Sequence, residues 1–159
     1  MRKIISHRGK PVSRLAALFF LLFVFFQHSG SAQQTTIRDY VLFGARSTQI
    51  GTSTTITGGR IGSNQLVQTI GNTNITADIN SEGRVQLANS NTIRGNITAK
   101  NSGSSALGIS AGSNFSLPNN KSEIHAGGNV TIQSGMIRGS LYMPSTATYI
   151  GPKVVERFE

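Results

Sequence analysis

Residues 123–141 read Glu-Ile-His-Ala-Gly-Gly-Asn-Val-Thr-Ile-Gln-Ser-Gly-Met-Ile-Arg-Gly-Ser-Leu, and an earlier stretch of the chain carries the same pattern. Asp-Ile-Asn-Ser-Glu-Gly-Arg-Val-Gln-Leu at 78–87 aligns with the first ten residues of that stretch, and Ile-Arg-Gly recurs at 93–95 and 137–139. The period is therefore about 45 residues. Self-similarity at a fixed period is typical of stacked repeats, in which each unit buries its apolar side chains against its neighbours.

The spacing of isoleucines divides this repeat into smaller coils. Ile-rich segments begin at residues 56, 75, 93 and 137, and each follows an aliphatic residue, namely Ile50, Ile70, Leu87 and Ile132. The first steps are 19 and 18 residues, and the last step of 44 is twice 22, with Phe115-Ser116-Leu117 supplying the missing rung. We therefore predict a coil of roughly 18 to 22 residues, with two coils in each long repeat.

The composition predicts an all-β fold. Residues 33–159 are rich in Ser, Thr, Gly and Asn, and isoleucine is the main apolar residue. Isoleucine and threonine suit a pleated surface, whereas glycine and asparagine suit tight turns. No window has apolar residues at helical spacing over two turns. We predict a right-handed parallel β-helix (a β-solenoid) of about five to six short coils over residues 40–152, with a β-sandwich as the alternative.

Several segments are expected to depart from the regular coil. Asp39 to Gly44 is a dense apolar strand, predicted to cap and bury the open first coil. Residues 101–105 read as a flexible loop, and 117–121 as a turn that bulges out of the stack. Pro144 and Pro152 fit strand ends, and residues 153–159 form a charged tail that could blunt the last open edge.

The first 32 residues have the layout of a secretory signal peptide. A basic region precedes a continuous apolar run at 15–26, and small residues follow up to Ala32, where cleavage is expected. The apolar run has 12 residues, against the roughly 20 that a helix needs to cross a bilayer. We expect a signal peptide at 1–32, a short linker at 33–39, and a protein that is secreted or at the cell surface, with the periplasm as an alternative.

Charge and cysteine content exclude some classes of function. The whole chain has a net charge of +9, but residues 33–159 carry 10 Lys+Arg against 6 Asp+Glu. These cations are single and widely spaced, so the basic, aromatic-interleaved footprint of a nucleic-acid site is missing. The chain has no cysteine, which removes disulfides and cysteine-based metal sites. We therefore expect no nucleic-acid partner, and contact with a membrane only during export.

Candidate chemistry is sparse. Asp78 and Glu123 occupy equivalent repeat positions, so they could lie on one face, two coils and about 10 Å apart, as a carboxylate pair. The alternative interpretation is that both are solvated turn carboxylates. His125 is the only histidine after residue 32, aligns with Asn80, and is expected at an outward turn position. We assign no catalytic, cofactor-binding or metal-ligating residue, and no cofactor.

The stretches at 128–135, 137–141 and 148–152 resemble β-helical repeat segments of exported bacterial surface proteins of the adhesin type, common in Bacteroidetes. They are also broadly similar to the polymer-forming, bactofilin-type β-helix. The resemblance implies a structural or adhesive role with glycans, matrix or other copies of the chain as partners. We therefore expect a non-catalytic, exported surface module, with a fragment of a secreted carbohydrate-active β-helix as the alternative, and either a short module or the start of a longer protein.

Overall fold

The computed structural model describes residues 39–101, 107–154 and, for the backbone alone, 156–158. The predicted signal peptide, the predicted linker up to residue 38 and residues 102–105 of the predicted loop lie outside the described residues. The described residues form three parallel sheets, and they contain no α-helix.

Each sheet takes every third strand of the chain as far as β17, and β18 follows β16 in sheet A. Sheet A contains β1 (Tyr40–Gly44), β4 (Arg60–Ser63), β7 (Asp78–Ser81), β10 (Ile97–Ala99), β13 (Glu123–Ala126), β16 (Ser140–Tyr142) and β18 (Glu156–Phe158). Sheet B contains β2 (Ser47–Ile50), β5 (Leu66–Thr69), β8 (Arg84–Leu87), β11 (Leu107–Ala111), β14 (Asn129–Ile132) and β17 (Tyr149–Ile150). Sheet C contains β3 (Thr55–Ile56), β6 (Asn74–Ile75), β9 (Thr92–Ile93), β12 (Phe115–Leu117) and β15 (Gly135–Ile137).

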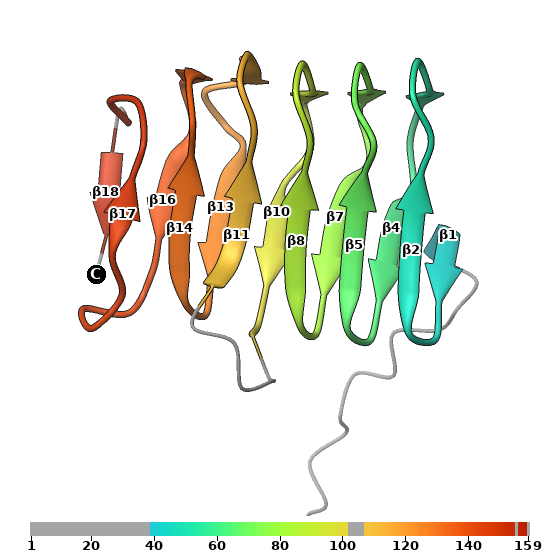
Figure 1. Cartoon of the computed structure of the whole chain (residues 1–159), viewed down its shortest axis with the longest axis horizontal. Coiled ribbons are helices and arrows are strands. Elements are labelled where there is room, and N and C mark those ends of the chain that lie inside the picture. Colours follow the sequence, from blue (N-terminus) through green and yellow to red (C-terminus); the bar gives the residue numbers. More distant parts are fainter. Residues whose placement is uncertain (1–38, 102–106, 155, 159) are drawn as a thin grey trace, which may run out of the picture. The chain divides into compact units, whose positions relative to one another are not determined.

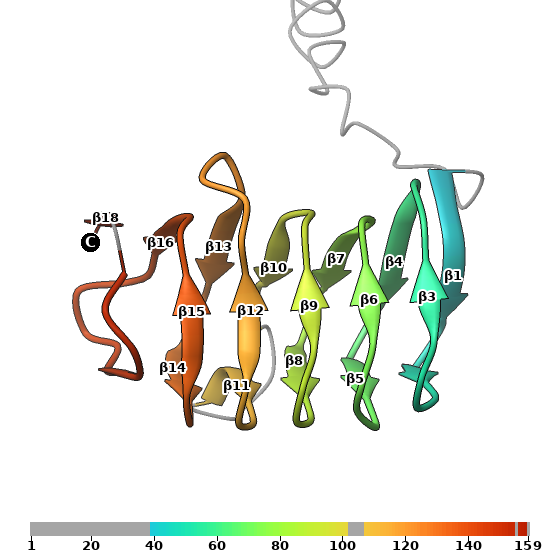
Figure 2. The same ribbon diagram turned by 90° about the horizontal axis from the view of Figure 1, so that it is seen from above.

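This order makes the described chain a parallel β-solenoid of about six turns. Successive coils lie side by side, so that β2, β5 and β8 run in the same direction along one face (Figure 1). Sheet C forms another face, with the strands of sheet A visible behind it (Figure 2). All the pairings are parallel, which confirms the predicted β-solenoid and excludes the β-sandwich alternative.

Inward side chains stack in columns through the core. In sheet A, one column consists of Ile61, Ile79, Ile97, Ile124 and Leu141, all of which are fully buried. Aliphatic and β-branched side chains fill such a column well because every coil presents the same inward position at the strand spacing of about 4.8 Å. The predicted repeat is therefore confirmed: Ile79 and Ile124 share one column, two coils apart.

The two coils of the long repeat differ in length, so the predicted equal division is wrong. In sheet A, 18 residues separate Ile79 from Ile97, whereas 27 separate Ile97 from its partner Ile124. The longer coil contains the turn predicted at 117–121, and Figure 2 shows that the connection between β12 and β13 rises above the neighbouring turns. The difference arises because extra residues can be added at a corner without disturbing the inward columns.

The core position of the second coil is Thr69, and Ile70, which the isoleucine spacing aligns with Ile50, Leu87 and Ile132, lies outside the core. Thr69 pairs with Ile50 and is buried, whereas Ile70 is 52% exposed. Threonine has the branched shape of valine, and its hydroxyl oxygen accepts a hydrogen bond from the backbone N–H of Ala88 at 3.0 Å. Its polar atom is thus satisfied inside the stack, and the burial costs little.

The first strand is a rung of sheet A and does not bury the end of the solenoid as predicted. β1 pairs with β4, but Val41, Leu42 and Phe43 remain 52%, 41% and 38% exposed. Leu42 continues the inward column of Ile61, so its exposure follows from its place at the open end. At the other end, residues 156–158 of the predicted charged tail form β18, which pairs in parallel with β16.

The corners between sheets B and C depend on residues with a left-handed backbone. Ser53, Asn72, Ser90 and Asn114 follow one another up this corner with φ between 51° and 59°. Their backbone N–H groups bond to the next coil, as in the 2.8 Å bond from Ser90 N to Ser113 O. Asparagine tolerates this conformation better than most residues with a side chain, and the two serines adopt it at equivalent places of the corner.

Candidate functional site

Asp78 and Glu123 of sheet A face outward, and both residues take part in hydrogen bonds along the stack, Asp78 through its carboxylate and Glu123 through its backbone N–H. Asp78 Oδ1 accepts a hydrogen bond from Asn96 N at 2.8 Å, and Asn96 Oδ1 accepts one from Glu123 N at 2.9 Å. The Asp78 and Asn96 side chains therefore each satisfy a backbone donor of the next coil. The three residues form a relay that ties β7, β10 and β13 together.

Asp78 and Glu123 lie where the repeat alignment predicts them. Both begin strands of sheet A, and β10 alone lies between those strands, so two strand spacings, about 10 Å, separate their backbones. The Asn96 side chain lies between them in the relay. The prediction that the two carboxylates share one face is confirmed, but they lie on strands, and the interpretation as turn residues is wrong.

An ion pair joins adjacent coils at the corner between sheets A and B. Lys100 Nζ lies 2.7 Å from Glu82 Oε1, and the two side chains are 60% and 49% exposed. An exposed pair of this kind contributes about 0–1 kcal/mol, because water screens both charges. Its main consequence is that the ammonium group beside β10 already has a counter-charge.

His125 lies in the middle of strand β13, on the outward side. It shares a row with Thr98, which in turn pairs with Asn80, so the alignment of His125 with Asn80 is confirmed, while the predicted turn position is wrong. Its Nε2 is 2.8 Å from Glu123 Oε2, and its ring stacks on the Tyr142 ring with centroids 4.5 Å apart and planes 2° from parallel. An ionised carboxylate only accepts hydrogen bonds, so in the tautomer with a proton on Nε2 the imidazole donates this bond to Glu123.

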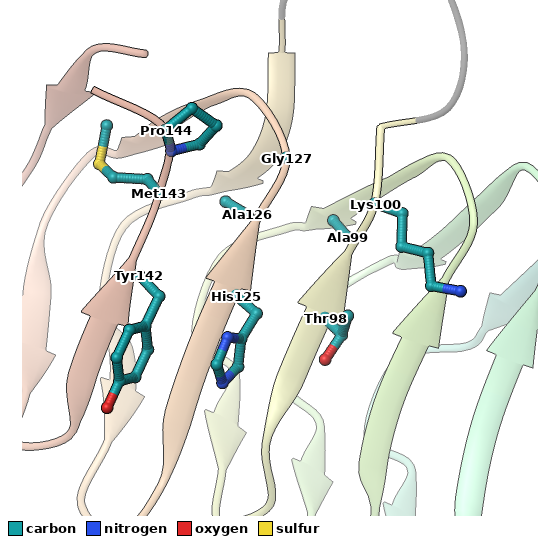
Figure 3. Close-up of a pocket in the computed structure, with 9 residues that line it drawn as sticks. All are labelled: Thr98, Ala99, Lys100, His125, Ala126, Gly127, Tyr142, Met143 and Pro144. Atoms are coloured by element: carbon teal, nitrogen blue, oxygen red, sulfur yellow. The ribbon is translucent and has the colours of Figure 1, made fainter. Parts of the chain in front are cut away.

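A shallow pocket of about 360 Å³ lies beside this stack, where β10, β13 and β16 end and the chain turns toward sheet B (Figure 3). Its lining comes from three successive coils and combines the aromatic, hydroxyl and ammonium groups of this face with small apolar residues. The lining residues are Thr98, Ala99, Lys100, His125, Ala126, Gly127, Tyr142, Met143 and Pro144. This hollow is therefore the candidate binding site of the sheet A face.

Sequence reasoning identified His125 and missed its neighbours. Thr98, His125 and Tyr142 belong to three different coils and meet only because the strands pair in register. The signal was present in the repeat itself, since the alignment that pairs Ile97 with Leu141 also pairs Thr98 with Tyr142. Tyrosine is scarce in this chain, with three in total, so an outward tyrosine beside the only histidine after residue 32 marks this place.

Glu123 and His125 could exchange a proton, but their side chains are 46% and 44% exposed, and no third group from the described residues is bonded to the imidazole as a nucleophile or an orienting partner. Across the described residues, no group of three His, Asp or Glu side chains comes together in a way that could hold a metal ion. A search of the same residues for a helix with the length and apolarity to span a bilayer finds none.

In comparisons with known proteins, no family model, no curated protein and no solved structure matches the chain.

Proposed function

We propose that the chain is an exported, non-catalytic β-solenoid with a structural or adhesive role at the cell surface or outside the cell. The observation that carries this proposal is the use of the carboxylates. The Asp78 carboxylate belongs to the relay between coils, and the Glu82 carboxylate is paired with Lys100 of the next coil. The Glu123 carboxylate is paired with His125 on the same strand, so two of these three carboxylates help to hold adjacent coils together.

Two features of the sequence support the extracellular part of this proposal. The layout of residues 1–32 is typical of a secretory signal peptide. The repeats at 128–135 and 137–141 resemble those of bacterial surface adhesins. A stack without cysteine also suits this role, because parallel ladders in which every coil bonds to its neighbours hold the fold without a disulfide. The mechanism is display: the coils present outward polar rows to glycans, to matrix or to another copy of the chain.

Export is tested by determining in which cell fraction the protein accumulates and at which residue it begins. When the full chain is produced in a bacterium with an intact secretory pathway, we expect a mature form that begins at Gln33 outside the cytoplasm. Cell fractionation and intact-mass measurement check this result. A matched variant with Leu22→Arg, which interrupts the apolar run, should remain unprocessed in the cytoplasm. Recovery of an uncleaved wild-type chain in the cytoplasm would contradict the proposal.

A carbohydrate-active protein is the second candidate, and the shared ladder of Asp78 and Glu123 is the observation that favours it. We expect purified wild-type protein and the double variant Asp78→Asn, Glu123→Gln to release no reducing ends from acidic or neutral polysaccharides. The amide substitutions suit this test because the side-chain oxygen that remains at position 78 would still accept the N–H of Asn96, so the stack is preserved.

The control for this test is thermal unfolding, which should be similar for the two proteins. Turnover by the wild type that disappears in the double variant, with an unchanged melting temperature, would establish the enzyme and reject the display module. The expected result is that neither protein shows turnover and that both unfold at similar temperatures.

The open end of the stack supports self-association as part of the same proposal. Among the described strands, β1 pairs with β4 alone, so it is an edge strand of the described part of sheet A, and it carries the exposed side chains of Val41 and Phe43. Such an edge is a template for a further strand.

A further inference from the structure

The pocket beside β10, β13 and β16 has an aromatic wall with one free face. Tyr142 covers one face of the His125 ring, and on the opposite side the next residue of the row is Thr98, whose side chain is much shorter (Figure 3). The pocket is lined by both residues, and 44% of the His125 side chain is exposed. Because the Thr98 side chain is shorter than the imidazole, the face of the His125 ring on that side stays uncovered and borders the pocket.

Polar groups border this surface. The Thr98 hydroxyl has no hydrogen-bond partner among the described residues, and Lys100, whose ammonium group is paired with Glu82, also lines the pocket. Ala99, Ala126 and Gly127 line it where the strands end, and the side chains of Ala99 and Ala126 are buried in the core. Gly127 keeps the coils close, because a Cβ atom there would lie 2.1 Å from the carbonyl oxygen of Lys100. A few convergent polar groups around an apolar surface are typical of small-ligand sites.

The charged groups at the pocket already have partners. Lys100 Nζ lies beside Glu82 Oε1, and Glu123 Oε2 lies 2.8 Å from His125 Nε2. A charged ligand would have to compete with these pairs, whereas a neutral ligand with many hydroxyl groups would only add hydrogen bonds. A pyranose ring meets both requirements, since it has an apolar C–H face that packs on an aromatic ring and hydroxyl groups around its edge.

We propose that this pocket binds one pyranose ring of a neutral saccharide. The C–H face of the sugar lies on the free face of His125, and its hydroxyl groups bond to Thr98 Oγ1 and Lys100 Nζ. Tyr142 is a positioning residue, which holds the imidazole plane from behind. This inference rests on the proposed display function and assigns it a ligand class and a place on the solenoid.

The test measures saccharide binding to the intact solenoid. Purified protein is titrated with soluble tetrasaccharides of glucose, galactose, mannose and N-acetylglucosamine, and binding is followed by isothermal titration calorimetry and by NMR of the His125 ring. We expect at least one of them to bind the wild type. His125→Ala should weaken that binding by about tenfold or more, because the ring face is lost.

Thr98→Phe is the decisive variant, because a phenyl ring at 98 would stack on His125 and occupy the place of the sugar. It should abolish binding while leaving the melting temperature equal or higher, since it extends the row of paired aromatic side chains. Gln86→Ala, at an outward position of β8 in sheet B, is the matched control and should bind as the wild type does.

Two outcomes would overturn the inference: failure of all four saccharides to bind the wild type, or binding that survives both His125→Ala and Thr98→Phe. Neither outcome contradicts the proposed function, whose export is measured separately on the same protein. Conversely, saccharide binding by a chain that stays in the cytoplasm would leave the pocket assignment standing and reject the surface role.

Discussion

Phe115→Ala should lower the free energy of unfolding by about 3–5 kcal/mol, the usual cost of removing a fully buried phenylalanine. Phe115 is 1% exposed and is the largest of the fully buried side chains. It lies on β12, in the coil where the chain has its longest step, and it faces the core beside Leu117. The neighbouring coils are fixed by their own ladders, so they cannot close the cavity, and the loss includes both the transfer free energy and the cavity.

Chemical denaturation followed by circular dichroism measures this change. The matched control is Phe43→Ala, the same substitution on the edge strand β1, where the side chain is 38% exposed and meets Tyr40 edge to face at 5.2 Å. We expect the control to lose about 1 kcal/mol, the value of the aromatic contact. Equal losses in the two variants would show that residue 115 does not occupy the core of the stack.

The inward columns were predictable because they obey one simple requirement. Each coil presents one side chain to the same column at the same height, and only compact aliphatic side chains fill that space well. The repeat alignment alone therefore pairs Ile79 with Ile124 and Ile97 with Leu141, and these pairs share a column in the solenoid. A requirement that repeats in every coil leaves a trace in the sequence that a single contact does not.

The corners and the exceptions were not predictable in the same way. Thr69 takes a core position because its shape resembles valine and because the N–H of Ala88 is available to its hydroxyl, which hydropathy does not reveal. Coil lengths vary because corners accept extra residues while the columns stay in register. The rung that the isoleucine spacing lacks between residues 93 and 137 is Phe115–Leu117, which forms β12 between β9 and β15 as predicted.

The pocket illustrates a further limit of sequence reasoning. Thr98, His125 and Tyr142 become neighbours only once the pairing of β10, β13 and β16 is known, and a wrong coil length would shift each of them to another place. The repeat alignment contained half of this information, since it related alternate coils. It did not relate adjacent coils, which differ in sequence, and adjacent coils are the ones whose side chains touch.

Gly135→Ala should destabilise the solenoid by about 3–5 kcal/mol, although it adds a single methyl group. Gly135 begins β15 with φ of 142°, a conformation that residues with a side chain rarely adopt. A Cβ atom at this position would lie 1.8 Å from the carbonyl oxygen of Phe115 and 2.7 Å from its carbonyl carbon, which is backbone of the adjacent coil. Neither the strained backbone nor the contact can relax alone, because β15 and β12 are paired through Phe115 and Gly135 themselves.

Gly51→Ala provides the matched control, because a methyl group there would meet nothing closer than the hydroxyl oxygen of Thr54 at 3.8 Å, an ordinary contact. We expect this variant to unfold within about 0.5 kcal/mol of the wild type, as substitutions away from special features do. A solenoid transmits such damage only to adjacent coils, so hydrogen exchange in Gly135→Ala should rise first in β12 and β15 and last in β2 and β5. If the two alanine variants instead unfolded together, the close approach of coils at Gly135 would not be a condition of stacking, and the register of sheet C would have to differ there.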